Sequence, residues 1–157
     1  KPLQKIEFDS NFAELNILIK NKKDESDKYF FVTNNGRWTG FIDENILKTV
    51  SIKKWERHFV GDFKKPIDSF ESVYSNDKLW KTIERIEETG KGFILVLNSA
   101  DIPLGIIDRS KIGNFVLNKL GFNLPSEIVN KLNYKNQYPL GIEFPRIINS
   151  MKQKGDL

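Results

Sequence analysis

The sequence predicts a mixed α/β (α+β) fold built from two copies of one plan, a small sheet accompanied by two helices. The plan is clearest in the second half of the chain. There, five apolar residues, Phe93–Leu97, predict a buried strand, and Ile102–Ile107 predicts a second strand after a polar turn. Asp108 then marks the start of a helix whose apolar positions include Ile112 and Val116.

An earlier stretch repeats this plan when the chain is shifted by 65 residues. Tyr29–Val32 then coincides with Ile94–Leu97 without a gap. Segments 40–43 and 105–108 both read Gly, two apolar residues and Asp. Internal repeats of this kind are structural units. Because each copy holds too few elements to bury its own apolar face, we expect a pseudo-two-fold pair with a shared core.

Local signals predict the other elements of the first copy. Lys1–Phe8 alternates weakly, which fits either a short strand or an extended lead-in. Asn11 with Glu14 resembles a capping box for the next helix. Asn-Gly at positions 35–36 is a strong hairpin signal. Apolar residues continue at helical spacing from Asp43 to Phe59, so this stretch is expected to be helical.

The second copy begins after a break. Glycine and proline in Val60–Pro66 separate the halves, and Ile67–Tyr74 alternates as a strand does. A helix follows, capped by one of the three polar residues 75–77 and ended by Gly90. Beyond residue 120, breaks at Gly121 and Pro125 precede helical patterns. We therefore expect repeats at 1–59 and 60–120 and a C-terminal helical extension at 121–157.

Composition narrows the function. The 157 residues carry a formal charge of +4 and include no cysteine, which excludes disulfides and thiol chemistry. Only five of the 25 basic residues are arginine, the residue suited to bidentate phosphate and guanine contacts, so no nucleic-acid partner is expected. No run of 18 apolar residues and no signal peptide occurs, so direct membrane insertion is not expected. A start at Lys1 instead of Met indicates a piece of a longer protein.

These residues resemble those of a known family. The succession of Val60–Pro66, a capped helix, the FILVL strand, PLGIID and a further helix resembles a cystathionine-β-synthase (CBS) domain. With the 65-residue repeat, the chain resembles a tandem CBS pair, or Bateman module. The resemblance implies a regulatory module that dimerises and binds AMP, ADP, ATP or S-adenosylmethionine in clefts between its repeats. Residues Ile46, Leu47, Phe115 and Val116 are the apolar helical positions expected to meet in a homodimer.

A narrower resemblance rests on the order of short motifs. GRWTGFID, a later Trp55, GIIDRS, a Leu-Pro break and YPLGI are together similar to the cytosolic C-terminal region of site-2-protease-type membrane zinc metalloproteases. The resemblance implies a domain on the cytoplasmic side of an integral membrane protein, attached to membrane protease segments. The chain has one histidine and hence no HExxH zinc motif, so no catalytic or metal site is expected in it.

The resemblance also implies a ligand site at the strand-to-helix junctions. In this sequence, the residues expected to form that ligand site are Gly40, Asp43, Gly105, Ile106, Asp108, Arg109 and Lys111. The family pattern ends in a carboxylate that accepts hydrogen bonds from ribose hydroxyls. Here Lys111 and Ile46 stand at that position, and neither side chain accepts a hydrogen bond, which argues against a standard adenosine site. Arg109 and Lys111 could still hold a phosphate by charge.

A purely structural interpretation stays open beside the ligand interpretation. The glycines could serve tight strand-to-helix turns, and Asp43 and Asp108 are good helix N-caps. His58 has no second His or Cys to form a metal site with, and the three tryptophans suit core or dimer contacts better than stacking platforms.

Two main hypotheses follow: a regulatory pair that senses an adenine nucleotide and modulates an attached membrane metalloprotease, and a degenerate pair that acts as a dimerisation scaffold without nucleotide. Nucleic-acid binding is a third hypothesis and requires binding that falls steeply with salt. A free-standing enzyme is disfavoured because no nucleophile–base or metal constellation is present.

Overall fold

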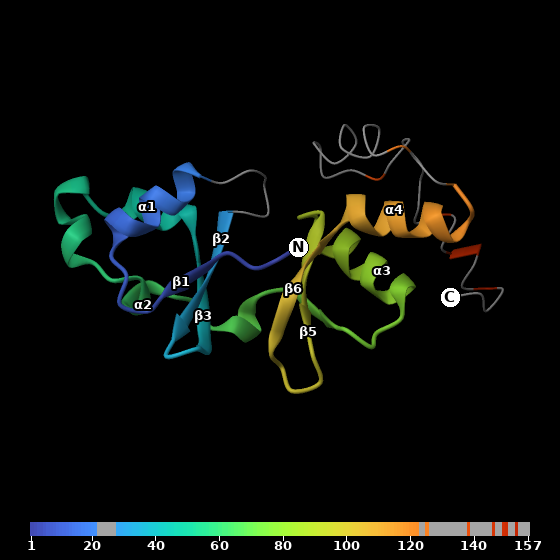
Figure 1. Ribbon diagram of the computed structural model, residues 1–157, viewed down its shortest axis with the longest axis horizontal. Coiled ribbons are helices and arrows are strands. Elements are labelled where there is room, and N and C mark those ends of the chain that lie inside the picture. The colour runs from blue at the N-terminus through green and yellow to red at the C-terminus, as the bar shows by residue number, and fades with distance from the viewer. Residues whose placement is uncertain are drawn as a thin grey trace. The chain divides into compact units, whose positions relative to one another are not determined.

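The computed structural model describes residues 1–21 and 28–122, together with Pro125, Tyr138, Arg146, Asn149, Ser150 and Gln153. Most of the predicted C-terminal extension therefore lies outside the described residues. The described chain is mixed α+β and forms two compact units, Pro2–Phe70 and Lys1 with Glu71–Leu157 (Figure 1). Residues 60–70 lie in the first unit, where the Val60 amide donates to the Ser10 carbonyl (2.8 Å) and the Gly61 amide to the Phe8 carbonyl (2.9 Å).

The first unit is a three-stranded sheet with short helices. Strand β2 is central, parallel to β1 and antiparallel to β3. The elements are β1 (Lys5–Glu7), α1 (Phe12–Lys20), β2 (Tyr29–Asn34), β3 (Arg37–Asp43), the 3-10 helices η2 (Glu44–Thr49) and η3 (Ile52–Arg57), α2 (Val60–Phe63) and the 3-10 turn η4 (Ile67–Ser69).

The second unit repeats this topology with longer helices. Strand β5 is central, parallel to β4 and antiparallel to β6. Its elements are β4 (Ser72–Tyr74), α3 (Leu79–Thr89), β5 (Phe93–Leu97), β6 (Pro103–Asp108) and α4 (Arg109–Lys119). The fold class predicted from the sequence is confirmed, with a small sheet and helices in each half.

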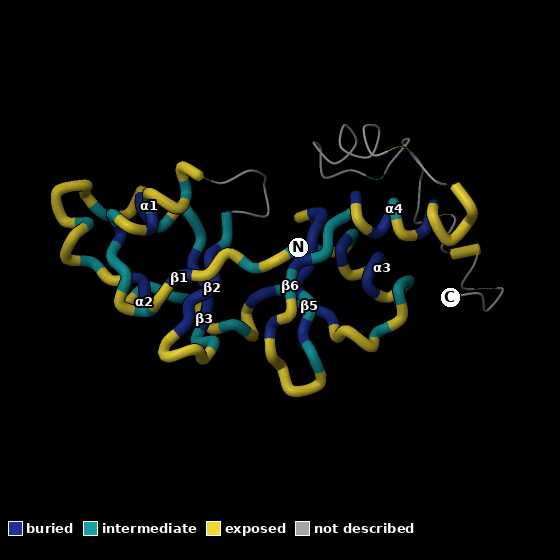
Figure 2. The backbone as a smooth tube through the Cα atoms, in the orientation of Figure 1, coloured by how far each residue is buried: buried dark blue, intermediate teal, exposed yellow. Residues whose placement is uncertain are grey.

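Each unit has its own hydrophobic cluster. In the first, Phe12 and Leu15 of α1 pack with Phe30 and Val32 of β2. In the second, the cluster includes Ile83 and Ile86 of α3, Ile94 of β5, and Ile112 and Val116 of α4. Figure 2 shows that the central strands are largely buried and the hairpin turns exposed. Burying one such side chain stabilises the fold by about 1.5–3 kcal/mol, so these clusters hold the helices to the sheets.

The ungapped repeat alignment is wrong by one residue in the central strands. Val32 pairs with Gly40 in the first unit, whereas Val96 pairs with Gly105 in the second. Val32 therefore corresponds to Val96, not to Leu97. The connections cause the difference: seven residues separate Val32 from Gly40, among them the Asn35-Gly36 turn at φ 50° and 77°, whereas eight residues separate Val96 from Gly105. A one-residue shift matters because it sends every side chain to the opposite face.

Three local predictions also need correction. The helical stretch from Asp43 to Phe59 consists of two 3-10 helices instead of α-helix. The predicted strand Ile67–Tyr74 starts as a 3-10 turn and is strand only over Ser72–Tyr74. Helix α3 has Lys78 at its N-cap without a side-chain cap, because the Asp77 carboxylate accepts from the Tyr74 amide (3.0 Å) instead.

Other local predictions are confirmed. Asn11 and Glu14 form the reciprocal capping box at the start of α1. Gly90 ends α3 in the left-handed conformation, with φ 64°. Within the part of the chain that the structure describes, no helix combines the length and apolarity needed to cross a lipid bilayer.

Candidate functional site

The candidate residues fall at two equivalent junctions. Gly40 and Asp43 lie at the β3–η2 junction of the first unit. Gly105, Ile106, Asp108, Arg109 and Lys111 come together at the β6–α4 junction of the second unit. The family-like segment is thus a strand end followed directly by a helix in both units.

The surface beside Gly40 is covered by another segment of the same chain, around Lys65. Phe41 and Lys65 form an antiparallel bridge in which each amide donates to the other's carbonyl, at 2.9 and 2.8 Å. A Cβ atom on Gly40 would collide with the Lys65 carbonyl oxygen. The absence of a side chain is therefore what lets the Lys65 segment pair with β3.

The second unit has the same arrangement with Lys1. The Ile106 amide donates to the Lys1 carbonyl (3.0 Å), and the Lys1 amino nitrogen donates to the Ile106 carbonyl (2.8 Å). A Cβ on Gly105 would lie 2.8 Å from the Lys1 carbonyl oxygen. Ile106 itself is buried, so it contributes its backbone to this pairing and its side chain to the interior.

These two pairing segments were not predicted, although the sequence carries a signal for them. Lys1-Pro2 and Lys65-Pro66 are the same dipeptide, 64 residues apart. Because proline lacks an N–H, it limits such a pairing to a short stretch. The dipeptide repeat is therefore the mark of the two lead-in segments that lie over Gly105 and Gly40.

Both candidate aspartates act as helix N-caps, as the structural interpretation predicted. The Asp43 carboxylate accepts from the Asn45 amide at 2.9 Å, and the Asp108 carboxylate from the Lys111 amide at 2.9 Å. The Asp43 carboxylate also accepts a hydrogen bond from the Lys65 ammonium at 3.2 Å. This bond connects the N-cap of η2 with the segment that pairs with β3. Each cap satisfies a helical amide that would otherwise lack a partner.

The Arg109 side chain is bound by the carboxylate of Glu87, which was not among the predicted site residues. Its Nε and Nη2 donate to the two oxygens of Glu87 at 2.8 and 3.0 Å, and the Tyr138 hydroxyl donates to the same carboxylate at 2.8 Å. The Arg109 guanidinium also lies 5.8 Å from the centre of the Tyr138 ring. These contacts position the Arg109 charge against α3.

The contacts among Glu87, Arg109 and Tyr138 favour an ionised Glu87 and a charged Arg109. Burial opposes ionisation of Glu87, but hydrogen bonds from Arg109 and Tyr138 outweigh it, so the pKa of this carboxyl lies below its usual value. The hydrogen bonds to Glu87 raise the pKa of Arg109. Burial, followed by the neighbouring carboxylate, raises the pKa of Tyr138, so its hydroxyl stays protonated and donates.

The residues at the family's carboxylate position differ between the units. Lys111 is exposed in the first turn of α4. Ile46 is partly buried and packs against the first hydrophobic cluster. Of the other positions predicted for dimer contact, Leu47 and Val116 are largely buried within their own units, which leaves them little surface for a partner chain. Phe115 is 51% exposed.

The aromatic residues and His58 have structural contacts. Trp55 and Trp80 pack against the first and second clusters respectively. Trp38 meets Phe31 edge to face, with centroids 6.4 Å apart. His58 Nδ1 lies 2.8 Å from the Lys54 carbonyl oxygen. Among the described residues, no group of three His, Asp or Glu side chains is placed to hold a metal ion.

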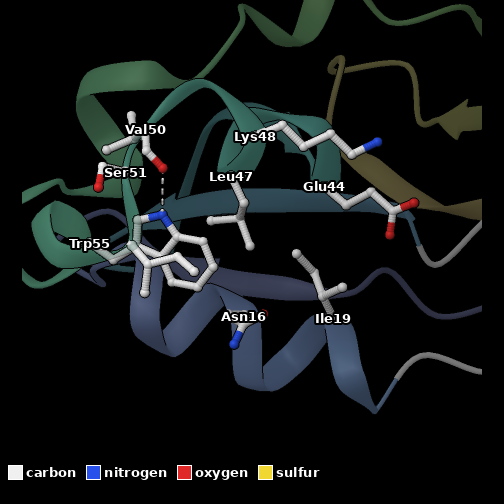
Figure 3. Close-up of a pocket in the computed structure, with 9 residues that line it drawn as sticks. Asn16, Ile19, Glu44, Leu47, Lys48, Val50, Ser51 and Trp55 are labelled. Carbon is white, nitrogen blue, oxygen red and sulfur yellow. Dashed lines mark hydrogen bonds between the residues drawn. The ribbon is translucent and has the colours of Figure 1, made fainter.

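A cavity of about 570 Å³ lies elsewhere in the first unit and was not predicted. Side chains from α1, η2 and η3 line it (Figure 3). Trp55 and Val50 stand at one end, Glu44 and Lys48 at the other, and Leu47 between them. None of the candidate residues lines the cavity, although Glu44 directly follows Asp43 in the chain.

Comparison with known proteins gives a likeness at the level of structure only. No family model and no curated relative matches the sequence. OpuCA of Staphylococcus aureus is similar in structure, with 19% identity and a TM-score of 0.54 over 76% of this chain and 93% of that one. A CBS domain-containing protein of Bacillus anthracis has 19% identity and a TM-score of 0.55 over 74% and 85% of the two chains.

A third similar structure is the CBS domain of a bacterial CNNM/CorC family Mg²⁺ transporter in complex with ATP. It has 11% identity and a TM-score of 0.55 over 74% of this chain and 80% of that one. At these identities the likeness concerns the fold. With a three-stranded sheet and helices repeated in two units, this chain has the fold of a tandem CBS-domain pair.

Proposed function

We propose that the chain is a regulatory CBS-pair module that senses an adenine nucleotide and modulates an attached site-2-type membrane metalloprotease. The observation that carries the nucleotide part is the β6–α4 junction. It keeps the order Gly105, two apolar residues and Asp108, and adds an exposed Lys111 in the first turn of a helix. A cation at a helix N-terminus is suited to a phosphate group. Two structures of similar fold, the CNNM/CorC domain and the cytosolic domain of the Mg²⁺ channel MgtE, are complexes with ATP.

The remaining parts of this proposal rest on the sequence resemblance. They are a homodimer, a position on the cytoplasmic side of the membrane, and the division into repeats 1–59 and 60–120 with an extension at 121–157. S-adenosylmethionine is an alternative ligand for the same junction. Reading the coding region on either side of these residues tests the protease attachment, with an upstream HExxH motif among apolar segments as the expected result. An open reading frame without that motif would contradict it.

A second candidate function is a degenerate pair that acts as a dimerisation scaffold and binds no nucleotide. The observation in its favour is that charges of the candidate site already have protein partners. Arg109 forms an ion pair with Glu87. The Asp108 carboxylate accepts from the Lys111 amide, and the Asp43 carboxylate accepts from the Lys65 ammonium. A ligand phosphate would have to compete with Glu87 for Arg109.

A thermal-shift titration separates the two functions. A ligand at 100 times its Kd adds about 2.7 kcal/mol, which is roughly 5–10 °C for a chain of this size. We expect ATP, ADP, AMP or S-adenosylmethionine to produce such a shift and Lys111→Ala to reduce it. Lys119→Ala, in the last turn of the same helix, is the matched control and should leave the shift unchanged. No shift with any of the four compounds would favour the scaffold.

A further inference from the structure

The cavity in the first unit arises where the two repeats differ most. After Asp108 the chain forms α4, an α-helix of 11 residues that packs against α3 through Ile112 and Val116. After Asp43 it forms η2, a 3-10 helix of 6 residues, and then turns back through η3. A 3-10 helix is narrower and short. The space between α1, η2 and η3 is the cavity of about 570 Å³, hereafter the Trp55 pocket.

One end of the Trp55 pocket is apolar, and a hydrogen bond orients its indole ring. The Trp55 indole N–H donates to the Val50 carbonyl at 2.9 Å, so the polar atom of the ring is satisfied and its carbon surface faces the pocket (Figure 3). Leu47 and Ile19 add apolar wall, and Ile52 at the rim is 73% exposed. Leaving such surface exposed is unfavourable, and an apolar ligand would cover it.

The polar groups of the pocket are few and balanced in charge. Glu44 and Lys48 lie at the end away from Trp55, one of each sign, and the Lys48 ammonium donates to Asn45 at 2.8 Å. Asn16 and Ser51 also line the pocket, and within the described part of the chain neither side chain makes a hydrogen bond to protein. The pocket thus offers amide and hydroxyl groups but no excess positive charge for a phosphate chain.

Size and lining together define the ligand class. Small-molecule sites are concave, have volumes of roughly 300–1,000 Å³, and combine apolar walls with a few polar groups that orient the ligand. We propose that the Trp55 pocket binds a small, uncharged aromatic molecule, with its ring against Trp55 and Leu47 and its polar group toward Asn16. The lining of this site includes none of the residues proposed to bind a nucleotide, so the inference does not depend on the proposed function.

The test is a ¹H–¹⁵N NMR titration of the full 157-residue chain, read at the Trp55 indole signal, which W38F and W80F variants assign. The probe is benzamide, and two compounds of similar size serve as comparisons. Cyclohexanecarboxamide lacks the aromatic ring, and benzoate carries a negative charge. For a ligand so small we expect millimolar affinity for benzamide, with saturation near about 20 mM. The other two probes should bind about fivefold more weakly or worse, which is the effect of about one lost interaction.

Variants locate the binding. Asn16→Leu should weaken benzamide about fivefold by removing a hydrogen-bonding group, and Ser51→Phe should abolish binding by filling the rim. Leu104→Ala, at an exposed apolar position of the second unit, is the control and should change nothing. The same spectra report whether each variant is folded. Three results would each overturn the proposal. The Trp55 signal could stay unchanged up to about 20 mM benzamide, the three probes could bind equally well, or the Ser51→Phe variant could bind benzamide as tightly as the parent chain. Saturating ATP should leave the benzamide shifts intact.

Discussion

Arg109 and Glu87 form a two-point ion pair between α4 and α3, with N–O distances of 2.8 and 3.0 Å. The pair is only partly solvated, since the Arg109 and Glu87 side chains are 22% and 35% exposed. Exposed ion pairs contribute about 0–1 kcal/mol, whereas breaking a buried one costs about 3–5 kcal/mol. This pair lies between those limits, and its second hydrogen bond fixes its geometry.

The first prediction concerns the pH dependence of this pair. Because the pKa of Glu87 in the folded chain lies below its ordinary 4.5, ionised Glu87 stabilises the fold fully above about pH 4.5. That contribution is lost as the pH falls through the lower pKa of the folded state. Glu87→Gln should therefore reduce the free energy of unfolding by about 1–2 kcal/mol at pH 7, with a smaller difference at pH 3. Urea unfolding at both pH values measures this.

A neighbouring pair on the same helix provides the control. Arg85 and Glu88 are 3.0 Å apart, and the Glu88 side chain is 62% exposed. Glu88→Gln should cost only about 0.3 kcal/mol, as expected for a helical surface pair. Equal losses for the two glutamine variants at pH 7 would mean that the Glu87 pair has no special weight.

The second prediction concerns Gly40. A methyl group there would meet the Lys65 carbonyl, so Gly40→Ala must break or displace the bridge between Phe41 and Lys65. We expect a loss of about 2 kcal/mol in the free energy of unfolding, the usual effect of forcing an extra carbon into packed structure. Arg37→Ala, at an exposed position of the same strand, should change it by less than about 0.5 kcal/mol. Chemical denaturation measures the free energy of unfolding of both variants. If Gly40→Ala proves as stable as Arg37→Ala, the bridge between Phe41 and Lys65 does not contribute as described.

The features that could be predicted from sequence are those that a few neighbouring residues decide. The Asn35-Gly36 turn, the Asn11 capping box and the Gly90 terminus each depend on the backbone preferences of residues close in the chain. The 3-10 form of η2 could not be predicted, because α and 3-10 helices place apolar residues on similar faces. Asp77 had two possible partners, and the local sequence does not say that the Tyr74 amide is preferred.

Long-range pairings in the candidate site were beyond the sequence pattern. Lys65 reaches Gly40 and Phe41 from more than twenty positions away, and Tyr138 lies 51 positions from the Glu87 that it contacts. No spacing rule connects residues so far apart, because their meeting depends on how whole elements pack. The sequence did indicate that the Gly105 and Asp108 positions repeat those of Gly40 and Asp43, and the structure has both pairs at equivalent junctions.

The third prediction separates the capping role of Asp108 from a ligand role. If the carboxylate serves α4 by accepting from the Lys111 amide, its removal should destabilise the protein without any ligand present. Asp108→Ala should cost about 1 kcal/mol in unfolding free energy, and Asp108→Asn, which keeps the accepting oxygen, much less. Nucleotide titrations on Asp108→Asn then test binding in a stable background. An alanine variant as stable as the parent would remove the capping role.

The fourth prediction concerns Tyr138, whose ring packs against the second hydrophobic cluster while its hydroxyl donates to Glu87. Tyr138→Phe removes only the hydrogen bond and should cost about 1 kcal/mol. Tyr138→Ala also removes the ring from the cluster and from Arg109, and should cost about 3 kcal/mol. Tyr74→Ala is the matched control, because Tyr74 also donates its hydroxyl to a carboxylate, that of Asp101 at 2.8 Å, but is 43% exposed. Thermal unfolding should rank Tyr138→Ala well below Tyr74→Ala. The reverse order would mean that the Tyr138 side chain contributes little to the stability of the second unit.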